Sequence, residues 1–313
     1  MKLIRGIHNI RPEHANCVLT IGNFDGVHLG HQSVIEQVLV KAKELNTQSS
    51  VMLFEPQPRE FFSPTNAPER VSSFRDKYQK IAQLGVDQLL VIRFCSKFAR
   101  LTAEQFVQQL LVKQLAVRHL VIGDDFRFGL KRLGDFSMLE RSGVEYGFSV
   151  GSTQSFCSLG LRVSSTLLRK ALSDGHFNQV KHLLGRAYTI QGKVGHGAKL
   201  GRQLGFPTAN LRLPRSSSPL QGVFAVVVRS VNGQHVNWPA IANVGKRPSA
   251  NGQELLLEVH ILDRQEFLYG QRLVVEPLIK LRDEVKFNSL DILQQHVNSD
   301  IQRAKVWFES QDY

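Results

Sequence analysis

The sequence predicts two domains, an α/β domain with a parallel sheet followed by an antiparallel β-barrel domain with a C-terminal helix. The chain has 313 residues, and single hydrophobic cores seldom grow past about 250 residues, so two cores are expected. The first half alternates short apolar runs with amphipathic stretches, whereas the second half is a series of β-rich runs. We place the boundary where this pattern changes, so that the domains span residues 1–185 and 186–313.

Alternating strands and helices are expected throughout the first half. Short apolar runs occupy residues 17–22, 51–54, 89–94 and 119–123, and amphipathic stretches occupy 30–45, 74–84, 102–116 and 177–184. Strand–helix alternation of this kind is typical of a Rossmann-like parallel sheet covered on both faces. In such folds ligands bind at the carboxyl ends of the strands, so the motifs that follow the apolar runs are the first candidates for a site.

The second half is expected to form a compact barrel. Its β-rich runs cover residues 188–194, 222–231, 238–244, 255–262 and 272–281, with Gly, Pro and Asn between them. Many short strands separated by turn residues favour an antiparallel barrel. Residues 289–308 then carry apolar side chains at helical spacing, which predicts a final amphipathic helix.

Composition narrows the classes of function. The net charge is +12, but the basic residues are scattered and form no block of five, which favours small polyanionic ligands over nucleic acid. No run approaches the ~18 apolar residues of a membrane span, and the N-terminal segment lacks a signal-peptide core. Cys17, Cys95 and Cys157 are odd in number and widely spaced, which favours neither disulfides nor zinc. We therefore expect a cytoplasmic protein with small-molecule partners and no nucleic-acid or membrane partner, its oligomeric state left open.

A histidine pair marks the first candidate site. In TIGNFDGVHLGHQSVIEQVL, His28 and His31 stand where a helix is expected to begin, and Gly30 between them removes a side chain that would keep a nucleotide from the backbone. Unpaired amides and the positive end of the helix dipole suit a phosphate there. A polar helix cap without any ligand is the alternative. The preceding turn supplies further backbone amides, from Gly22, Asn23, Phe24 and Asp25.

Two other segments strengthen the nucleotide interpretation. GDDFRFG follows a strand and offers Asp125 and Arg127, while VSSTLLRKAL opens a later helix with Ser164, Thr166 and Arg169. Alone, the hydroxyls could be a simple helix cap and the aromatics plain core. Together, at the ends of parallel strands, they indicate a nucleotide site.

These motifs resemble the FMN adenylyltransferase half of bacterial FAD synthetases, in the H-x-G-H nucleotidylyltransferase superfamily, over roughly residues 1–184. The resemblance implies that His28 and His31 are catalytic and contact the ATP phosphates, that the segment 164–169 helps to bind them, and that Asp125 and Arg127 line the site. The attacking FMN phosphate is already largely ionised near pH 7, because its second pKa is ~6, so the site must supply alignment and positive charge rather than a base.

The sequence departs from this family at two positions. Gln57 stands where relatives often have His, and Lys131 replaces a usual Gly. Contacts made at these two positions are therefore the ones least expected to match those of the family.

A glycine-rich segment marks the second candidate site. QGKVGHGAKLGRQLGFPTANL is neither a Walker A motif nor a dinucleotide fingerprint, and a hairpin with bulges is its bland interpretation. The Pro-Thr-Ala-Asn run places Thr208 and Asn210 on one side of an extended chain, and both are hard oxygen donors suited to Mg²⁺. The candidate nucleotide or flavin contacts of the loop are Gly197, Lys199 and Gly201.

PTAN, with GVFAV, NVGKRP, LEVHILD and LYG, resembles the riboflavin kinase family over residues 186–313. An alcohol is not ionised at pH 7 and benefits from a base during phosphorylation. The resemblance implies that Glu258 is this base and that Arg282 contacts nucleotide or flavin. An ion pair of Arg282 with Asp283 or Glu284 is the alternative for that side chain.

The two resemblances together identify the chain as a member of the bifunctional riboflavin kinase/FAD synthetases of bacteria. They imply ATP-dependent phosphorylation of riboflavin to FMN and adenylylation of FMN to FAD with release of pyrophosphate, with Mg²⁺ as cofactor. One rival is an adenylyltransferase for a pantetheine or nicotinate nucleotide with the barrel as an appendage, against which PTAN and Glu258 argue. The other is a basic RNA-binding or flavin-sensing module, which the charge of +12 favours.

Overall fold

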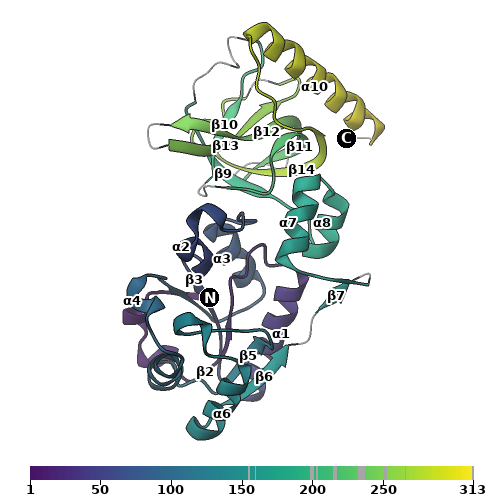
Figure 1. Ribbon diagram of the computed structural model, residues 1–313. Helices are drawn as coiled ribbons and strands as arrows, with labels where there is room; N and C mark the ends of the chain where they lie inside the picture. The colour runs from purple at the N-terminus through teal and green to yellow at the C-terminus, as the bar shows by residue number, and fades with distance from the viewer. Residues whose placement is uncertain are drawn as a thin grey trace. The chain divides into compact units, whose positions relative to one another are not determined.

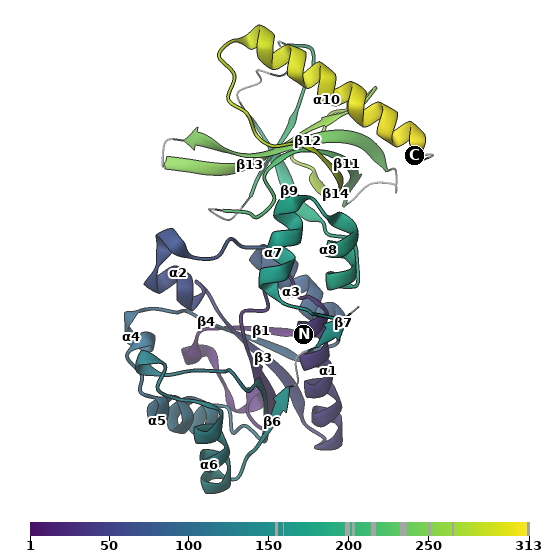
Figure 2. The same cartoon turned by 45° about the vertical axis from the view of Figure 1, so that its right-hand side comes forward.

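The computed structural model contains two compact units. Residues 1–153, 156–158, 160–197, 201, 204–213, 217–231, 237–249, 252–264 and 266–311 are described. The sheet unit comprises Met1–Pro68 and Phe74–Ser164, and the barrel unit comprises Glu69–Ser73 and Ser165–Tyr313. Both kinds of predicted architecture are present (Figures 1 and 2).

A six-stranded sheet forms the centre of the sheet unit. Its strand order is β1-β4-β3-β2-β5-β6, and every neighbouring pair is parallel. The parallel sheet expected from the alternating pattern is therefore confirmed. The strands are β1 (Lys2–Arg5), β2 (Cys17–Ile21), β3 (Gln48–Phe54), β4 (Gln88–Ile92), β5 (His119–Gly123) and β6 (Ser149–Thr153).

Helices connect these strands. The α-helices are α1 (Leu29–Glu44), α2 (Pro58–Phe62), α3 (Phe74–Gln83), α4 (Ser96–Ala99), α5 (Ala103–Gln105) and α6 (Phe136–Tyr146). Four 3₁₀ turns, η1 (Ile7–Asn9), η2 (Pro12–His14), η3 (Pro64–Asn66) and η5 (Leu130–Arg132), and a short β7 (Cys157–Ser158) and β8 (Leu161–Arg162) pair complete the unit. The helix expected over 102–116 is α5 continued by a π-helical stretch, η4 (Phe106–Gln114).

Both faces of the sheet are covered by apolar packing. On β2, Cys17 and Leu19 belong to one buried cluster, while Val18 packs with Val38 and Ala42 of α1 in another. Successive side chains of a strand point to opposite faces, so this division shows that β2 is buried on both sides. The edge formed by the carboxyl ends of the strands is thus where a ligand can reach polar groups.

The barrel unit contains a closed barrel of six strands in the order β10-β13-β12-β11-β14-β9. All of its paired neighbours are antiparallel, as predicted. The strands are β9 (Ile190–Gly195), β10 (Ala209–Arg212), β11 (Gly222–Ser230), β12 (Trp238–Ser249), β13 (Gly252–Ile261) and β14 (Arg272–Arg282).

The final helix, α10 (Leu290–Ser310), lies against the barrel wall (Figure 2). It begins after Ser289, whose Oγ accepts a hydrogen bond of 3.3 Å from the Ile292 amide. Ala304 and Phe308 pack in a cluster with Val223 and other apolar residues of the strands. The predicted C-terminal helix is confirmed. Within the described residues, no helix combines the length and the apolar character that crossing a membrane requires.

The barrel unit begins upstream of the boundary that the sequence pattern predicts between residues 185 and 186. Helices α7 (Ser165–Asp174) and α8 (Phe177–Leu184) belong to it. The Phe177 ring lies 5.9 Å from that of Phe224 on β11. The segment Glu69–Ser73 also joins this unit, where the Tyr188 hydroxyl donates a hydrogen bond of 2.9 Å to the Val71 carbonyl. The helical pattern ends at residue 185, but the packing of these helices is with the barrel.

Candidate active sites

The first candidate site, called the sheet site, lies where the strand order reverses. From β2 the chain continues through β3 and β4 on one side, while the neighbour on the other side is β5. In open α/β sheets, ligands bind at such a switch point, beside the carboxyl ends of the strands. The segment from Gly22 to His31 leaves β2, and the segment containing Asp125 and Arg127 leaves β5. The fold therefore brings two of the three predicted motif segments to neighbouring strand ends.

His28 and His31 form a stacked pair at the start of α1. Their ring centroids are 3.7 Å apart, with an interplanar angle of 13°. The backbone amide of His31 donates a hydrogen bond of 3.2 Å to Nδ1 of His28, which makes His28 the N-cap of the helix. The polar cap considered from the sequence is thus present. The cap uses Nδ1 of His28, and a role of the ring in ligand binding stays a prediction.

The turn before this pair has an unusual backbone. Phe24, Gly26 and Val27 have φ angles of 48°, 80° and 44°, and side chains with a Cβ avoid this left-handed region. Asp25 is only 1% exposed. A Cβ on Gly30 would lie 3.2 Å from Nδ1 of His28 and 3.4 Å from the Val163 carbonyl oxygen. Conformations of this kind cluster at functional sites because the surrounding packing must hold them.

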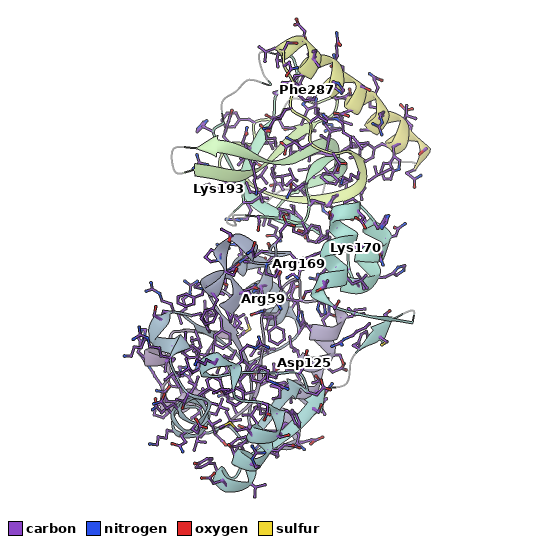
Figure 3. The ribbon with its side chains drawn as sticks, in the orientation of Figure 1. Arg59, Asp125, Arg169, Lys170, Lys193 and Phe287 are labelled. Atoms are coloured by element: carbon purple, nitrogen blue, oxygen red, sulfur yellow. The ribbon has the colours of Figure 1, made fainter. Side chains whose placement is uncertain are left out.

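The predicted residues after β5 are exposed. Asp125 is labelled in Figure 3, and its Oδ1 lies 2.9 Å from the position that a Cβ would take on Gly123. Arg127 donates a hydrogen bond of 3.0 Å to the carbonyl oxygen of its neighbour Phe126. Both side chains can therefore reach a ligand at the strand ends.

The structure accounts for one of the two departures from the family. Lys131 has a φ of 53°, a conformation that glycine adopts most readily, so the backbone suits the glycine that the resemblance implies at this position. Gln57 is 4% exposed and precedes α2, and its Nε2 is buried without a hydrogen-bond partner among the described residues. The backbone amide of Gln57 donates a hydrogen bond of 2.8 Å to Oε2 of Glu60.

The third predicted segment is divided between the units. Ser164 is the last residue of the sheet unit, directly after Val163, which lies against the histidine turn. Thr166 and Arg169 are on α7, in the barrel unit. Within that unit, Nε of Arg169 donates a hydrogen bond of 2.6 Å to the Glu69 carbonyl. A role for Thr166 and Arg169 in nucleotide binding stays a prediction.

An aromatic cluster at the same edge of the sheet was not predicted as a functional feature. Phe54 ends β3 and Phe94 follows β4, with ring centroids 5.6 Å apart. Phe61 lies 5.4 Å and Phe62 5.6 Å from Phe94. Phe62 is 67% exposed, so the cluster, which we define as Phe54, Phe61, Phe62, Phe94 and Phe98, presents apolar surface. The signal in the sequence was a Phe at or near the end of two neighbouring strands, Phe54 in β3 and Phe94 after β4.

The second candidate site, called the barrel site, is built on one row of side chains across five strands. In order, Asn210 on β10, Glu258 on β13, Asn243 on β12, Val223 on β11 and Arg282 on β14 stand directly opposite one another. Directly opposite residues of antiparallel strands share a face. The antiparallel register thus brings together three residues predicted separately, and it adds Asn243, which the sequence analysis missed.

A cavity of about 1060 Å³ opens beside this row. Its wall includes Thr208, Asn243, Glu258 and Arg282, together with Gly201. Asn243 donates a hydrogen bond of 3.4 Å from Nδ2 to Oε2 of Glu258, while its Oδ1 is buried without a hydrogen-bond partner among the described residues. The cavity therefore combines a carboxylate, an arginine and hydroxyl and amide groups in one place.

The glycine-rich loop is described in part. Lys199 lies outside the described residues. A Cβ on Gly197 would lie 2.6 Å from Cγ of Asn210, so the approach of that side chain requires a glycine. Nδ2 of Asn210 donates a hydrogen bond of 3.3 Å to the Thr208 carbonyl.

The oxygen atoms of Thr208 and Asn210 fit a Mg²⁺ ion that is held mainly by water and substrate phosphates. Among the described residues, no three His, Cys, Asp or Glu side chains gather as a metal cluster. Mg²⁺ commonly keeps several waters and takes its remaining ligands from substrate phosphates. One hydroxyl and one amide oxygen beside a large cavity suit such a weakly held ion, and do not suit a metal caged by protein alone.

Arg282 pairs with a residue other than those considered from the sequence. Its guanidinium contacts the carboxylate of Asp300 on α10, at 2.8 Å between Nη2 and Oδ2. Asp283 instead pairs with Lys280 at 2.7 Å, and the hydrogen bond and charge of Lys280 lower the pKa of the Asp283 carboxyl. The ion pair of Arg282 is thus made with the C-terminal helix and not with Asp283, the partner considered as an alternative from the sequence.

Comparisons with known proteins cover both units. The sequence matches the FAD synthetase family model over residues 10–167 and the riboflavin kinase model over residues 184–308. A Haemophilus influenzae protein named bifunctional riboflavin kinase/FMN adenylyltransferase is 47% identical over 310 residues, which cover 99% of this chain and 100% of the relative. An Escherichia coli protein of the same name is 47% identical over 309 residues, 98% of each chain.

A solved structure shares the fold along almost the whole chain. It is a Streptococcus pneumoniae protein named as a macrolide-efflux protein, with a TM-score of 0.76, 29% identity, and coverage of 97% of this chain and 99% of its own. Because full-length relatives and the models of both halves agree, the chain belongs to the family of bifunctional riboflavin kinase/FMN adenylyltransferases.

Proposed function

We propose that the barrel unit phosphorylates riboflavin and that the sheet unit adenylylates the FMN product, each at its own ATP site. The enzyme makes FMN from riboflavin and FAD from FMN, with ATP as co-substrate of both steps. The division of labour is supported by the family matches, since the FAD synthetase model ends at residue 167 and the riboflavin kinase model begins at residue 184. The row of Asn210, Glu258 and Asn243 carries the assignment of the barrel site.

In the sheet site, His28 and His31 hold the ATP phosphates. Because Nδ1 of His28 accepts the His31 amide proton, the neutral His28 ring carries its proton on Nε2 and can donate it to a phosphate oxygen. The amides of the Gly22–Asp25 turn and the side chains of Asp125 and Arg127 add contacts at the ends of β2 and β5. An FMN phosphate oxygen attacks the α-phosphorus, and the histidines, the turn amides and Arg127 stabilise the charge of the leaving pyrophosphate. Ser164, the last residue of the sheet unit, adds a hydroxyl contact to the ATP.

The aromatic cluster of Phe54, Phe61, Phe62, Phe94 and Phe98 receives the isoalloxazine ring of FMN. This planar ring is apolar over much of its area, and aromatic side chains bind such rings by offset stacking or edge contacts. The exposed ring of Phe62 is the one available for stacking. The cluster lies at the ends of β3 and β4, and β3 is the neighbour of β2 in the sheet, which supports a flavin position beside the proposed phosphate contacts.

In the barrel site, Glu258 removes the proton of the riboflavin 5′-hydroxyl as that oxygen attacks the γ-phosphorus of ATP. A neutral alcohol benefits from a positioned base by about 10²–10⁴-fold. Asn243 orients the carboxylate by donating to Oε2, and the carboxylate accepts the hydroxyl proton. Arg282 and Gly201 line the cavity and contribute nucleotide or flavin contacts, and the same kind of contact is proposed for Gly197 and Lys199.

Thr208 and Asn210 would hold Mg²⁺, which when bound neutralises charge on the transferring phosphoryl group. The protein must also hold the riboflavin hydroxyl, the Glu258 carboxylate and the γ-phosphate in alignment for the transfer. A cytoplasmic location fits an enzyme that consumes ATP in both reactions.

Incubation of the purified enzyme with riboflavin, ATP and Mg²⁺, followed by chromatography of the flavins, tests the proposal. FMN should appear before FAD, and chelation of the metal should stop both steps. A supply of FMN in place of riboflavin should yield FAD without a lag. Absence of FMN from riboflavin in a folded preparation would contradict the assignment of the barrel site.

A further inference from the structure

Asp300 is a carboxylate on the apolar face of α10. It precedes Ala304 and Phe308 by four and eight residues, and these three are the buried residues of the helix. This spacing places them on one face, and Asp300 is 2% exposed. A buried carboxylate loses hydration that an apolar side chain of similar size would not need. Its presence on this face therefore points to a task other than packing.

The partner of Asp300 is Arg282, at the end of the barrel-site row. Nε of Arg282 donates hydrogen bonds of 3.1 Å to Oδ1 and 2.9 Å to Oδ2, and Nη2 lies 2.8 Å from Oδ2. The arginine and aspartate side chains are 18% and 3% exposed. Both carboxylate oxygens are thus engaged by one edge of the guanidinium, which fixes its plane.

Two further contacts hold the same guanidinium. Nη1 donates a hydrogen bond of 3.1 Å to the Asp283 carbonyl. The carbon of the guanidinium lies 5.5 Å from the centroid of the Phe287 ring. Phe287, labelled in Figure 3, in turn packs at 4.9 Å on His296 of α10. The arginine is therefore held between the barrel and the helix.

This arrangement leaves part of the guanidinium for a ligand. An arginine has five N–H groups, and the contacts above use the one on Nε, one on Nη1 and one on Nη2. The second N–H of each Nη has no partner among the described residues, and Arg282 forms part of the cavity wall. Two N–H groups can thus be presented to an acceptor in the cavity.

A second carboxylate near Arg282 could compete with Asp300 for the guanidinium. Glu284 also lines the cavity and lies over Gly245, where it would meet any Cβ. A guanidinium freed from Asp300 has this second carboxylate only two residues further along the chain. Pairing with it would redirect the N–H groups from the substrate to the cavity wall.

We propose that Asp300 is a positioning residue for riboflavin phosphorylation. It holds Arg282 so that the guanidinium presents its remaining N–H groups to the substrate and does not pair with Glu284. The C-terminal helix is by this role part of the barrel site. The inference rests on the proposed role of Arg282 in that site.

A double-mutant cycle tests the inference. Steady-state phosphorylation of riboflavin is measured for Asp300→Asn, Arg282→Lys and the double variant. A misplaced contact can lower the rate by about 10²-fold, so Asp300→Asn should lower kcat/KM for phosphorylation by about that factor. If Arg282→Lys changes the KM for one of the two substrates, riboflavin or ATP, Asp300→Asn should change the KM for that same substrate. Residues that act as a unit are non-additive, so the double variant should be no worse than the poorer single variant. Asp300→Glu, which keeps the carboxylate, should recover part of the rate.

Controls separate positioning from folding. Glu309→Gln removes an exposed carboxylate from the same helix and should leave the kinetics unchanged. Adenylylation of supplied FMN should stay at the wild-type rate in every variant. Additive losses, or a lowered Tm for Asp300→Asn with unchanged kinase constants, would overturn the role of Asp300 alone. Unchanged kinetics in a folded Arg282→Lys variant would overturn the role of Arg282 as well.

Discussion

The rings of His28 and His31 are stacked with their centroids 3.7 Å apart, and the His31 amide donates to Nδ1 of His28. The Nδ1 atom of His28 therefore caps α1, and the proposed phosphate contact falls to the other ring nitrogen, Nε2. This relationship allows capping and phosphate binding to be separated by substitution.

Replacement of His28 by Asn should abolish adenylylation with little effect on stability. Asn is a good N-cap residue, so α1 keeps its cap, but the Nε2 donor is lost. Loss of one such donor lowers a rate by about 10²–10³-fold. FAD formation from FMN, followed by chromatography, should fall by this factor, and FMN should accumulate from riboflavin.

The double variant His28→Ala, His31→Ala removes the cap as well. It should lack FAD synthesis and also lose about 1 kcal/mol of stability, the usual contribution of an N-cap. Near-wild-type FAD synthesis in either folded variant would show that the pair is only a cap.

Glu258→Gln should stop the kinase step selectively. The amide preserves the size of the side chain but cannot accept the hydroxyl proton, so riboflavin phosphorylation should fall by about 10²-fold or more. Conversion of supplied FMN to FAD is the internal control and should be unchanged. Equal loss of both activities would point to a shared site or to misfolding.

Asn243→Leu should lower kinase activity without lowering stability. The Oδ1 of Asn243 is buried without a hydrogen-bond partner among the described residues, and such a group costs about 1–3 kcal/mol. Its removal should therefore leave Tm unchanged or raise it, while the unoriented Glu258 slows phosphorylation. A lower Tm with an unchanged kcat would instead assign Asn243 a structural role.

Gly197→Ala should impair the kinase through Asn210. The new Cβ would lie 2.6 Å from Cγ of Asn210 and force that side chain away. Gly195→Ala is a matched control, because the nearest atom to its Cβ is the Asn210 carbonyl oxygen at 4.0 Å. We expect a raised requirement for Mg²⁺ in the first variant only, measured by titration of the metal in the kinase assay.

A fragment that begins at Ser165 should be a better kinase than one that begins at Arg186. The shorter fragment lacks α8 and exposes the Phe224 side chain that packs on Phe177, so we expect it to aggregate. The longer fragment should fold and make FMN but no FAD. Size-exclusion chromatography and the flavin assay check both. A cooperatively folded 165–313 fragment without kinase activity would show that the barrel site needs residues before Ser165, from Glu69–Ser73 or from the sheet unit.

Local sequence patterns predicted the helices and strands better than the contacts that these elements make with one another. The apolar runs and the helical spacing located β2, α1 and α10, because burial and periodicity are written into neighbouring residues. The pairing register is not local, so nothing near Asn243 indicated that it stands opposite Glu258. Asp300 likewise resembled one polar residue among many on an amphipathic helix, until the fold placed Arg282 against it.

The domain boundary and the aromatic cluster show the same limit. The change from a helical to a β-rich pattern occurs at residue 185, yet α7 and α8 pack with the strands that follow. The unit to which a helix belongs is decided by contacts between segments that are distant in the sequence. Phe54, Phe61 and Phe94 come from three separate segments, each ordinary by itself. A motif such as the one around His28 lies in one short segment and can be recognised from the sequence, and its role in binding stays a prediction.

The strip Glu69–Ser73, which belongs to the barrel unit although it is encoded within the first half, has a consequence for recombination. The chain passes from one unit to the other after Pro68, again after Ser73 and a third time after Ser164. A chimera that joins halves of two relatives at a single junction would combine a barrel from one parent with this strip from the other. The Tyr188 hydroxyl and the Arg169 guanidinium bond to backbone carbonyls of Val71 and Glu69, which any parent supplies, whereas the Gln221 amide contacts the Glu69 side chain. Exchange of halves should therefore be tolerated best between parents that share the pair at positions 69 and 221.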